Sequence, residues 1–173
     1  MWNFLFGGRN READTSTSPE LLAIHKTVDV PAERAFEVFV DRLGSWWPRD
    51  LSWAKDDLDE IGIEAKTDGH CFERRKDGTT AVWGTVLTIS RPEHIVFTWQ
   101  IAPDRSPEPN PVLASRVDVR FAALTPETTD IVLVHRDFPR HGSGWQKYRA
   151  ALAAKSGWPL LLDRYAQALS RLP

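Results

Sequence analysis

Hydrophobic and polar positions follow two different periods along the chain, and each period predicts a different kind of element. The clearest period of two lies at 116–121, where Val117, Val119 and Phe121 alternate with charged residues, which is typical of a half-buried strand. Similar stretches bounded by turn residues predict six further strands, at 21–30, 61–66, 70–75, 80–89, 95–101 and 130–138. Short links join most of the later strands, so we expect them to pair as antiparallel neighbours.

A period of three to four residues predicts a helix near each end of the chain. Pro31 opens the first helix, where its missing N–H costs nothing, and an apolar stripe continues to Leu43. The second stripe is close to an ideal amphipathic face and comprises Trp158, Leu161, Leu162, Tyr165, Leu169 and Leu172. Pro159 disfavours helical geometry in the residue before it, so we expect an interruption in the C-terminal helical region, with Trp158 non-helical or distorted.

An antiparallel sheet with one apolar face needs a cover, and the C-terminal helix supplies it. The order of elements therefore predicts an α+β fold in which a curved seven-stranded antiparallel sheet wraps around a long C-terminal helix. Residues 1–20 have linker composition after a short apolar start, with Gly7 and Gly8 followed by polar residues up to Pro19. We expect 1–20 to be a flexible extension and 21–173 to form one domain.

Composition narrows the function classes. With 22 Lys and Arg against 24 Asp and Glu, the net charge is −2, which argues against a nucleic-acid partner. The single cysteine, Cys71, rules out an intrachain disulfide framework and a CxxC metal site. No apolar run is long enough to span a bilayer, and no motif for nucleotide, zinc or serine-hydrolase chemistry occurs. We therefore expect a cytoplasmic protein with no cofactor, no metal site and no membrane span.

Several stretches of the sequence carry a resemblance to a known family, namely 69–78, 82–87, 95–99, 134–138 and 157–162. Over about 21–172 the chain resembles proteins related to the activator of heat-shock protein 90 ATPase. These belong to the START-like (SRPBCC) superfamily, which also includes polyketide cyclases and birch-pollen-allergen-like lipid carriers. The resemblance implies the helix-grip fold, in which a curved antiparallel sheet wraps around the C-terminal helix, and it makes 21–173 a START-like ligand-binding domain.

Eight Trp, eight Phe and two Tyr are available either to fill or to line the space between sheet and helix, and the sequence leaves both open. Aromatic walls with a few polar groups suit a small-molecule pocket. Strand parity assigns Trp83, Trp99 and Phe72 to the inward face. The resemblance implies that His135 also faces the helix and that Trp47 lies near the cavity mouth. The expected ligand-binding residues are Trp47, Phe72, Trp83, Trp99, His135, Trp158 and Tyr165.

Glu73 is followed by Arg74 and Arg75 on a predicted strand. Adjacent strand residues point to opposite faces of a sheet, so one of these side chains is able to reach a ligand while its neighbour is solvated. The alternative is that they form surface ion pairs, and both interpretations stay open at this point.

Three function hypotheses follow. The first is a non-catalytic START-like protein, with no catalytic residue, that binds a small apolar or aromatic molecule between the sheet and the C-terminal helix. The second is an enzyme of the polyketide cyclase or dehydratase type, with His135 and a carboxylate as general acid and base. The third is a co-chaperone-type interaction module whose partner is a chaperone or a second copy of the chain. A filled core, an open polar-lined cavity or an exposed apolar patch would distinguish them.

Overall fold

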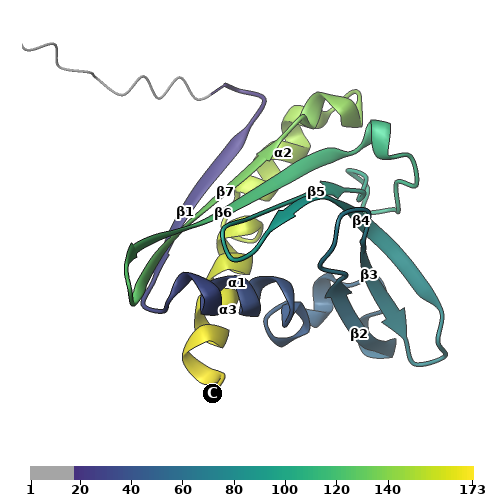
Figure 1. The fold of residues 1–173 in the computed structure, drawn as a ribbon. Coiled ribbons are helices and arrows are strands. Elements are labelled where there is room, and N and C mark those ends of the chain that lie inside the picture. The colour runs from purple at the N-terminus through teal and green to yellow at the C-terminus, as the bar shows by residue number, and fades with distance from the viewer. Residues whose placement is uncertain (1–17) are drawn as a thin grey trace, which may run out of the picture.

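Seven strands form one antiparallel sheet in the computed structural model, which describes residues 18–173 (Figure 1). The strands are β1 (Leu22–Val28), β2 (Leu58–Ile63), β3 (His70–Arg75), β4 (Thr80–Ser90), β5 (His94–Trp99), β6 (Ser115–Thr125) and β7 (Thr128–Arg136). Their order across the sheet is β1-β7-β6-β5-β4-β3-β2, so each strand from β2 to β6 pairs with the next strand along the chain, as predicted, and β1 pairs with β7. The expected extension lies outside the described residues over 1–17.

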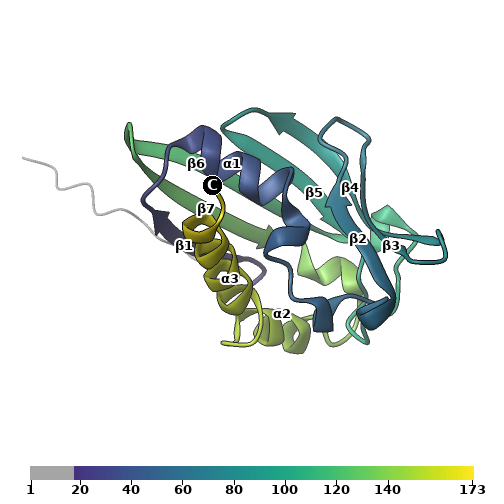
Figure 2. The ribbon, with the colours of Figure 1, turned by 90° about the horizontal axis from the view of Figure 1, so that it is seen from below.

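Residues 18–173 contain three α-helices, α1 (Ala32–Val40), α2 (Trp145–Ala153) and α3 (Trp158–Arg171). Short 3-10 turns occur at Leu43–Ser45, Arg49–Leu51, Lys55–Asp57, Pro111–Leu113 and Phe138–His141. Figure 2 shows α1 and α3 against the same face of the curved sheet, with α2 continuing toward one end. The curved sheet and the C-terminal helix confirm the helix-grip fold.

The inner face of α3 is fixed in the core by Tyr165. Its side chain is fully buried, and its hydroxyl donates a 2.7 Å hydrogen bond to the Ala35 carbonyl of α1. The ring also meets Phe39 and Trp46 edge-on, with centroids 5.3 and 5.5 Å away. Aromatic side chains bury much apolar area and prefer such edge contacts. Tyr165 therefore joins α3 to α1 by both packing and a polar contact.

An irregularity between β3 and β4 decides which aromatic residues face inward. Cys71 pairs with Gly84 and Phe72 pairs with Val82, so Trp83 is an extra residue in β4. Trp83 is buried, as predicted, but the inward assignment of Phe72 is wrong. In β3 the buried side chains are Cys71 and Glu73, and strand alternation turns Phe72 to the other face.

The interruption of the C-terminal helical region is confirmed, but Trp158 is helical rather than distorted. Trp158 is the first residue of α3, and Pro159 is the second. The first N–H groups of a helix have no acceptor within it, so proline is tolerated there. The chain instead turns at 154–157, where a Cβ on Gly157 would lie 2.2 Å from the Leu152 carbonyl oxygen. Only glycine fits this approach of α3 to the end of α2.

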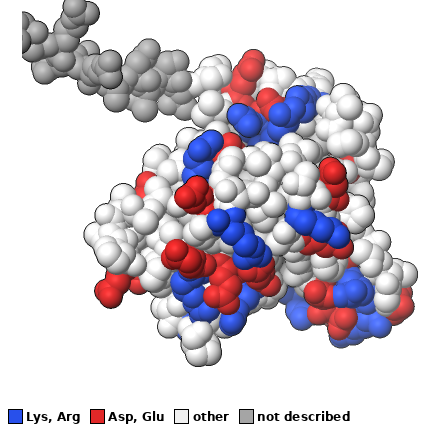
Figure 3. All heavy atoms as spheres, in the orientation of Figure 1, with Lys and Arg blue, Asp and Glu red and all other residues white. Residues whose placement is uncertain are grey.

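The outer surface carries charges of both signs. Figure 3 shows Lys and Arg intermingled with Asp and Glu on one face of the molecule. Several of these side chains form ion pairs, such as Lys26 with Asp163 at 2.7 Å and Arg116 with Asp137 at 3.2 Å. Within 18–173, none of the helices combines the length and the apolar character needed to cross a bilayer.

Substitution of Tyr165 tests the connection between α1 and α3. We expect Tyr165→Ala to lower the free energy of unfolding by about 3–5 kcal/mol, since it leaves a cavity in a packed core. Tyr165→Phe keeps the ring and loses only the hydrogen bond to Ala35, so about 1 kcal/mol is expected. Urea denaturation of the three proteins measures both values. Equal, small losses for both variants would contradict the packing described for Tyr165.

Candidate ligand-binding site

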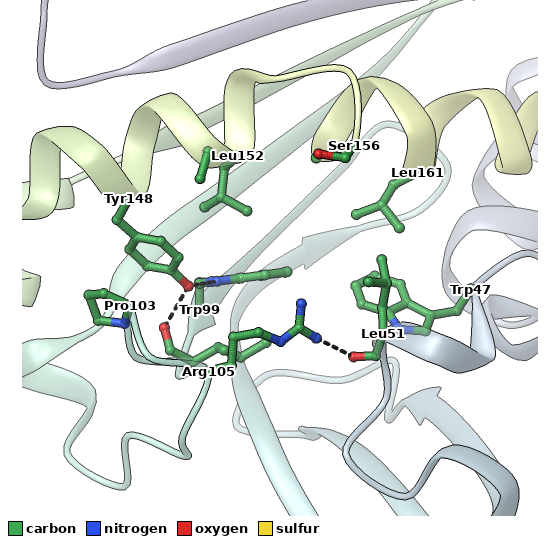
Figure 4. Close-up of a pocket in the computed structure, with 12 residues that line it drawn as sticks. Trp47, Leu51, Trp99, Pro103, Arg105, Tyr148, Leu152, Ser156 and Leu161 are labelled. Carbon is green, nitrogen blue, oxygen red and sulfur yellow. Dashed lines mark hydrogen bonds between the residues drawn. The ribbon is translucent and has the colours of Figure 1, made fainter.

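A cavity of about 260 Å³ opens where α2 meets α3. Figure 4 shows Leu152 of α2, Ser156 of the turn and Leu161 of α3 on one side, and Trp47, Leu51 and Arg105 on the other. The residues that line it are Trp47, Leu51, Trp99, Ile101, Pro103, Arg105, Tyr148, Ala151, Leu152, Ser156, Gly157 and Leu161. Most of them are apolar or aromatic, which is typical of a small-molecule pocket.

The helix interruption creates this hollow. Ser156 and Gly157 belong to the turn between α2 and α3, and both line the cavity. The glycine at 157 thus allows α3 to approach α2 closely while the turn leaves room beside it.

Trp99 and Tyr148 form one rigid wall of the cavity. The Trp99 indole Nε1 donates to the Tyr148 hydroxyl at 2.8 Å, and that hydroxyl donates to the Ile101 carbonyl at 2.8 Å (Figure 4). Burial raises the pKa of Tyr148 to about 12, so the phenol stays protonated at neutral pH and keeps this donor role. Both rings are therefore held in one orientation.

Trp47 continues the same wall, with its ring centroid 6.3 Å from that of Trp99, and it borders several hollows. Its ring stacks on Trp83 with centroids 5.6 Å apart and planes 22° apart. A smaller pocket of about 20 Å³ adjoins the cavity behind Trp47, and Glu73, Trp53 and Trp83 contribute to its lining. On its outer side, Trp47 also borders a surface groove of about 380 Å³ beside α3. Within the described residues, the buried indole N–H groups of Trp47 and Trp83 have no hydrogen-bond partner.

Reciprocal hydrogen bonds close one side of the cavity mouth. The Arg105 guanidinium donates to the Leu51 carbonyl at 2.8 Å, and the Arg105 carbonyl accepts from the Trp53 indole N–H at 2.6 Å. Arg105 has a φ of 69°, in the left-handed region that side chains rarely adopt. The loop after β5 is thus attached to the segment after α1 by two bonds.

Glu73 faces inward, as one of the two interpretations of its strand allowed. It is 3% exposed, and its two carboxylate oxygens accept backbone N–H groups from Trp53 at 3.0 Å and Ala54 at 2.7 Å. Buried carboxylates require such partners. Glu73 therefore orders the segment that carries Trp53, at the edge of the smaller pocket.

His135 lies behind the cavity wall, in a chain of buried polar groups. The Trp158 indole N–H donates to His135 Nδ1 at 3.0 Å, which leaves the proton of the neutral imidazole on Nε2. That nitrogen lies 2.7 Å from Ser115 Oγ, and Ser115 Oγ lies 2.8 Å from His141 Nε2. Since Ser115 accepts from His135, its hydroxyl donates to His141. The hydrogen bonds therefore run in one direction, from Trp158 to His135, from His135 to Ser115 and from Ser115 to His141.

The predicted site residues therefore fall into three groups. Trp47 and Trp99 line the main cavity, and Trp83 lines the smaller pocket that adjoins it. The residues that are buried without lining either space are His135, Trp158 and Tyr165. Phe72 faces away from the cavity, where the Arg74 guanidinium lies 5.7 Å from its ring centroid.

The cavity also contains residues that the sequence did not single out for a site, above all Leu51, Arg105, Tyr148 and Ser156. Tyr148 shares a helical spacing of three and four residues with Trp145 and Leu152, so the sequence does carry a signal for its burial. Arg105 and Leu51 lie on loops, where no period marks which side chain turns inward. Their roles follow from contacts between segments that are distant in sequence.

Comparisons with known proteins agree with this fold. Residues 29–170 match the model of the family described as activator of Hsp90 ATPase homolog 1-like protein. No curated protein sequence matches the chain. Among solved structures, Txn09, an anthrahydroquino-gamma-pyrone synthase complexed with SUM, has 29% identity and a TM-score of 0.61, covering 87% of this chain and 99% of its own.

Other solved structures share less sequence and show the fold alone. CalC, a self-sacrificing resistance protein from Micromonospora echinospora, has 23% identity and a TM-score of 0.60, covering 89% of this chain and 97% of its own. Protein NE0264 from Nitrosomonas europaea has 12% identity and a TM-score of 0.64, covering 88% of this chain and 96% of its own.

The buried histidine makes stability depend on pH. Burial, with a smaller effect from His141, holds the pKa of His135 well below its usual value of 6.5. As pH falls below 6.5, the unfolded chain binds a proton at this residue and the folded protein does not, so stability is lost toward acid. Protonation of His135 in the unfolded chain is expected to lower the free energy of unfolding by up to about 1.4 kcal/mol for each pH unit below 6.5.

Urea denaturation at pH 7.5 and pH 5 measures this effect. His135→Gln keeps an acceptor for Trp158 and a donor for Ser115 without the titration, so we expect a weaker dependence on pH. His70→Gln is the matched control, because the His70 side chain is 57% exposed. An unchanged pH dependence in His135→Gln would contradict the assignment.

Proposed function

The chain belongs to the activator of Hsp90 ATPase homolog 1-like family, and from this premise we propose that it is a non-catalytic protein that binds a small aromatic molecule in the cavity beside α2 and α3. The observation that carries the proposal is the aromatic wall formed by Trp47, Trp99 and Tyr148. Flat apolar faces of this kind favour a planar ring system, because offset and edge contacts between rings add to the burial of apolar area.

The size of the cavity limits the ligand. At about 260 Å³ it lies just below the usual range of roughly 300–1,000 Å³ for small-molecule sites. A molecule with two fused rings suits this volume. Of the expected site residues, Trp47, Trp83 and Trp99 remain the proposed ligand contacts, and Tyr148, Leu152 and Leu161 join them.

The groups around the cavity support binding better than acid–base catalysis. Its titratable lining residues are Arg105 and Tyr148, and Tyr148 stays protonated at neutral pH. His135 is fully buried behind Trp99, so it does not share the cavity with a carboxylate as an acid–base pair would require. These groups orient a molecule by contact and hydrogen bonding.

One observation favours an enzyme as the second candidate. Txn09, at 29% identity, is a synthase, and the Glu73 carboxylate lines the small pocket next to the cavity. In that case Glu73 would be the general base. A ligand that co-purifies and is recovered unchanged after incubation with fresh protein supports binding alone, whereas its conversion supports an enzyme. Native mass spectrometry identifies the compound before and after incubation.

An interaction module of the co-chaperone type has weaker support. The large apolar side chains that are exposed within 18–173 lie on three segments: Leu87 on β4, Val112 and Leu113 on the turn at Pro111–Leu113, and Leu124 on β6. Scattered exposed residues are normal at protein surfaces. A chaperone or a second copy of the chain therefore remains a secondary partner in this proposal.

The proposal includes a domain organisation and a location. The ligand-binding unit comprises 21–173, with 1–20 as an extension to it. A cytoplasmic location is supported by the single cysteine, Cys71, which is free and buried.

Filling the cavity tests the proposed function. We expect the wild-type protein to enhance the fluorescence of N-phenyl-1-naphthylamine, a neutral apolar dye, and Leu152→Trp to abolish the enhancement by occupying the ligand volume. Leu124→Trp is the control, because Leu124 is 60% exposed and does not line the cavity. Circular dichroism confirms that both variants are folded. Equal enhancement by the two variants would show that the dye binds elsewhere.

A further inference from the structure

Arg105 is the one formally charged side chain among the twelve residues that line the cavity. It extends from the loop after β5 across the mouth, between Tyr148 and Leu51 in Figure 4. Its neighbours in the lining are aromatic rings, aliphatic side chains and the hydroxyl of Ser156. Arg105 is exposed at the mouth, so its attraction for an anionic ligand is partly screened by water and is expected to weaken as the ionic strength rises.

The Arg105 guanidinium has no acidic partner within the described part of the chain. Several arginines have a carboxylate within 4.0 Å, such as Arg116 with Asp137, and Arg105 is in none of the ion pairs of the described residues. The neighbouring Asp104 carboxylate instead accepts from the backbone N–H and hydroxyl of Ser106, at 2.9 and 2.6 Å. Arg105 therefore retains an uncompensated charge at the mouth.

The present partner of Arg105 is replaceable. Its one hydrogen bond from the guanidinium goes to the neutral carbonyl of Leu51, at 2.8 Å. A guanidinium has five N–H donors, and its bond to an ionised oxygen is stronger than one to a neutral carbonyl. The Tyr148 hydroxyl has already used its proton on Ile101. The donors open to a ligand at the mouth are therefore those of Arg105 and the hydroxyl of Ser156.

Glu73 lies outside the main cavity, in the lining of the small pocket that Arg105 also borders. Its carboxylate is at the inner side, in the small pocket behind Trp47, and would repel a second negative charge placed there. The ionised group of a ligand is therefore favoured beside the Arg105 guanidinium rather than beside Glu73 in the small pocket, while the rings lie against Trp99 and Leu161.

We propose that the cavity selects planar aromatic molecules that carry one ionised oxygen group, such as an aromatic carboxylate or an ionised phenol, and that Arg105 is the residue that recognises this group. This inference rests on the proposed function, since it requires that the cavity binds aromatic molecules at all. It adds the charge of the ligand and its orientation, with the oxygen group at the mouth.

A matched pair of ligands tests the inference. 2-Naphthoate and 2-naphthamide have the same two-ring body and differ in charge at neutral pH. By isothermal titration calorimetry at low ionic strength, we expect the wild-type protein to bind the carboxylate about tenfold more tightly than the amide. Arg105→Gln should remove this preference, so that the variant binds the carboxylate and the amide with equal affinity. Arg164→Gln is the control, because Arg164 is exposed on α3 outside the cavity.

The outcomes separate this inference from the proposed function. Equal wild-type affinities for the two ligands, or a preference that survives Arg105→Gln, would overturn the role of Arg105 while leaving aromatic binding intact. Failure of the wild-type protein to bind either ligand would overturn the proposed function, and this inference with it. The wild-type preference is measured without any substitution, so the test does not depend on how well the variant folds.

Discussion

The hydrogen bond from the Trp158 indole to His135 fixes where α3 begins relative to the sheet. His135 lies on the concave face of β7 and is fully buried, so its ring nitrogens need partners inside the protein. Trp158 supplies one partner from the first turn of α3, and Ser115 supplies the other from β6. Without Trp158, a polar nitrogen would remain unpaired in an apolar core, at a cost of about 1–3 kcal/mol.

The position of Trp158 determines the shape of the neighbouring region. Because α3 begins at Trp158, α2 must end before it, and the chain turns at 154–157. That turn opens the space beside Ser156 and Gly157. The ring of Trp158 also packs 5.3 Å from the ring of Trp99, whose indole N–H holds Tyr148. The contacts of Trp158 in the core thus determine the position of both the cavity and its aromatic wall.

The sequence predicted the architecture well and the site only in part. Periods of two and of three to four residues identified the strands and helices, because burial on one face imposes those spacings directly. The error at Phe72 arose in β3, where the buried positions are Cys71 and Glu73, because a carboxylate at a buried position does not read as part of an apolar period. His135 does face inward. Strand parity does not predict the position of a residue along the sheet, however, and His135 lies behind the wall of the cavity rather than in it. Arg105 was missed because the position of its side chain depends on contacts with Leu51 and Trp53, which are distant in the sequence.

Trp47 has a consequence for how relatives of this protein diverge. Its ring is a shared boundary of the main cavity, the small inner pocket and the outer groove beside α3. Its indole N–H holds no partner in the described chain, and ring contacts to Trp46, Trp83 and Trp99 keep it in place. Replacement by a smaller residue would join the three spaces into one. Evolution at this single position is thus able to enlarge the range of accepted molecules while the bonds among Trp158, His135 and Ser115 are inherited unchanged.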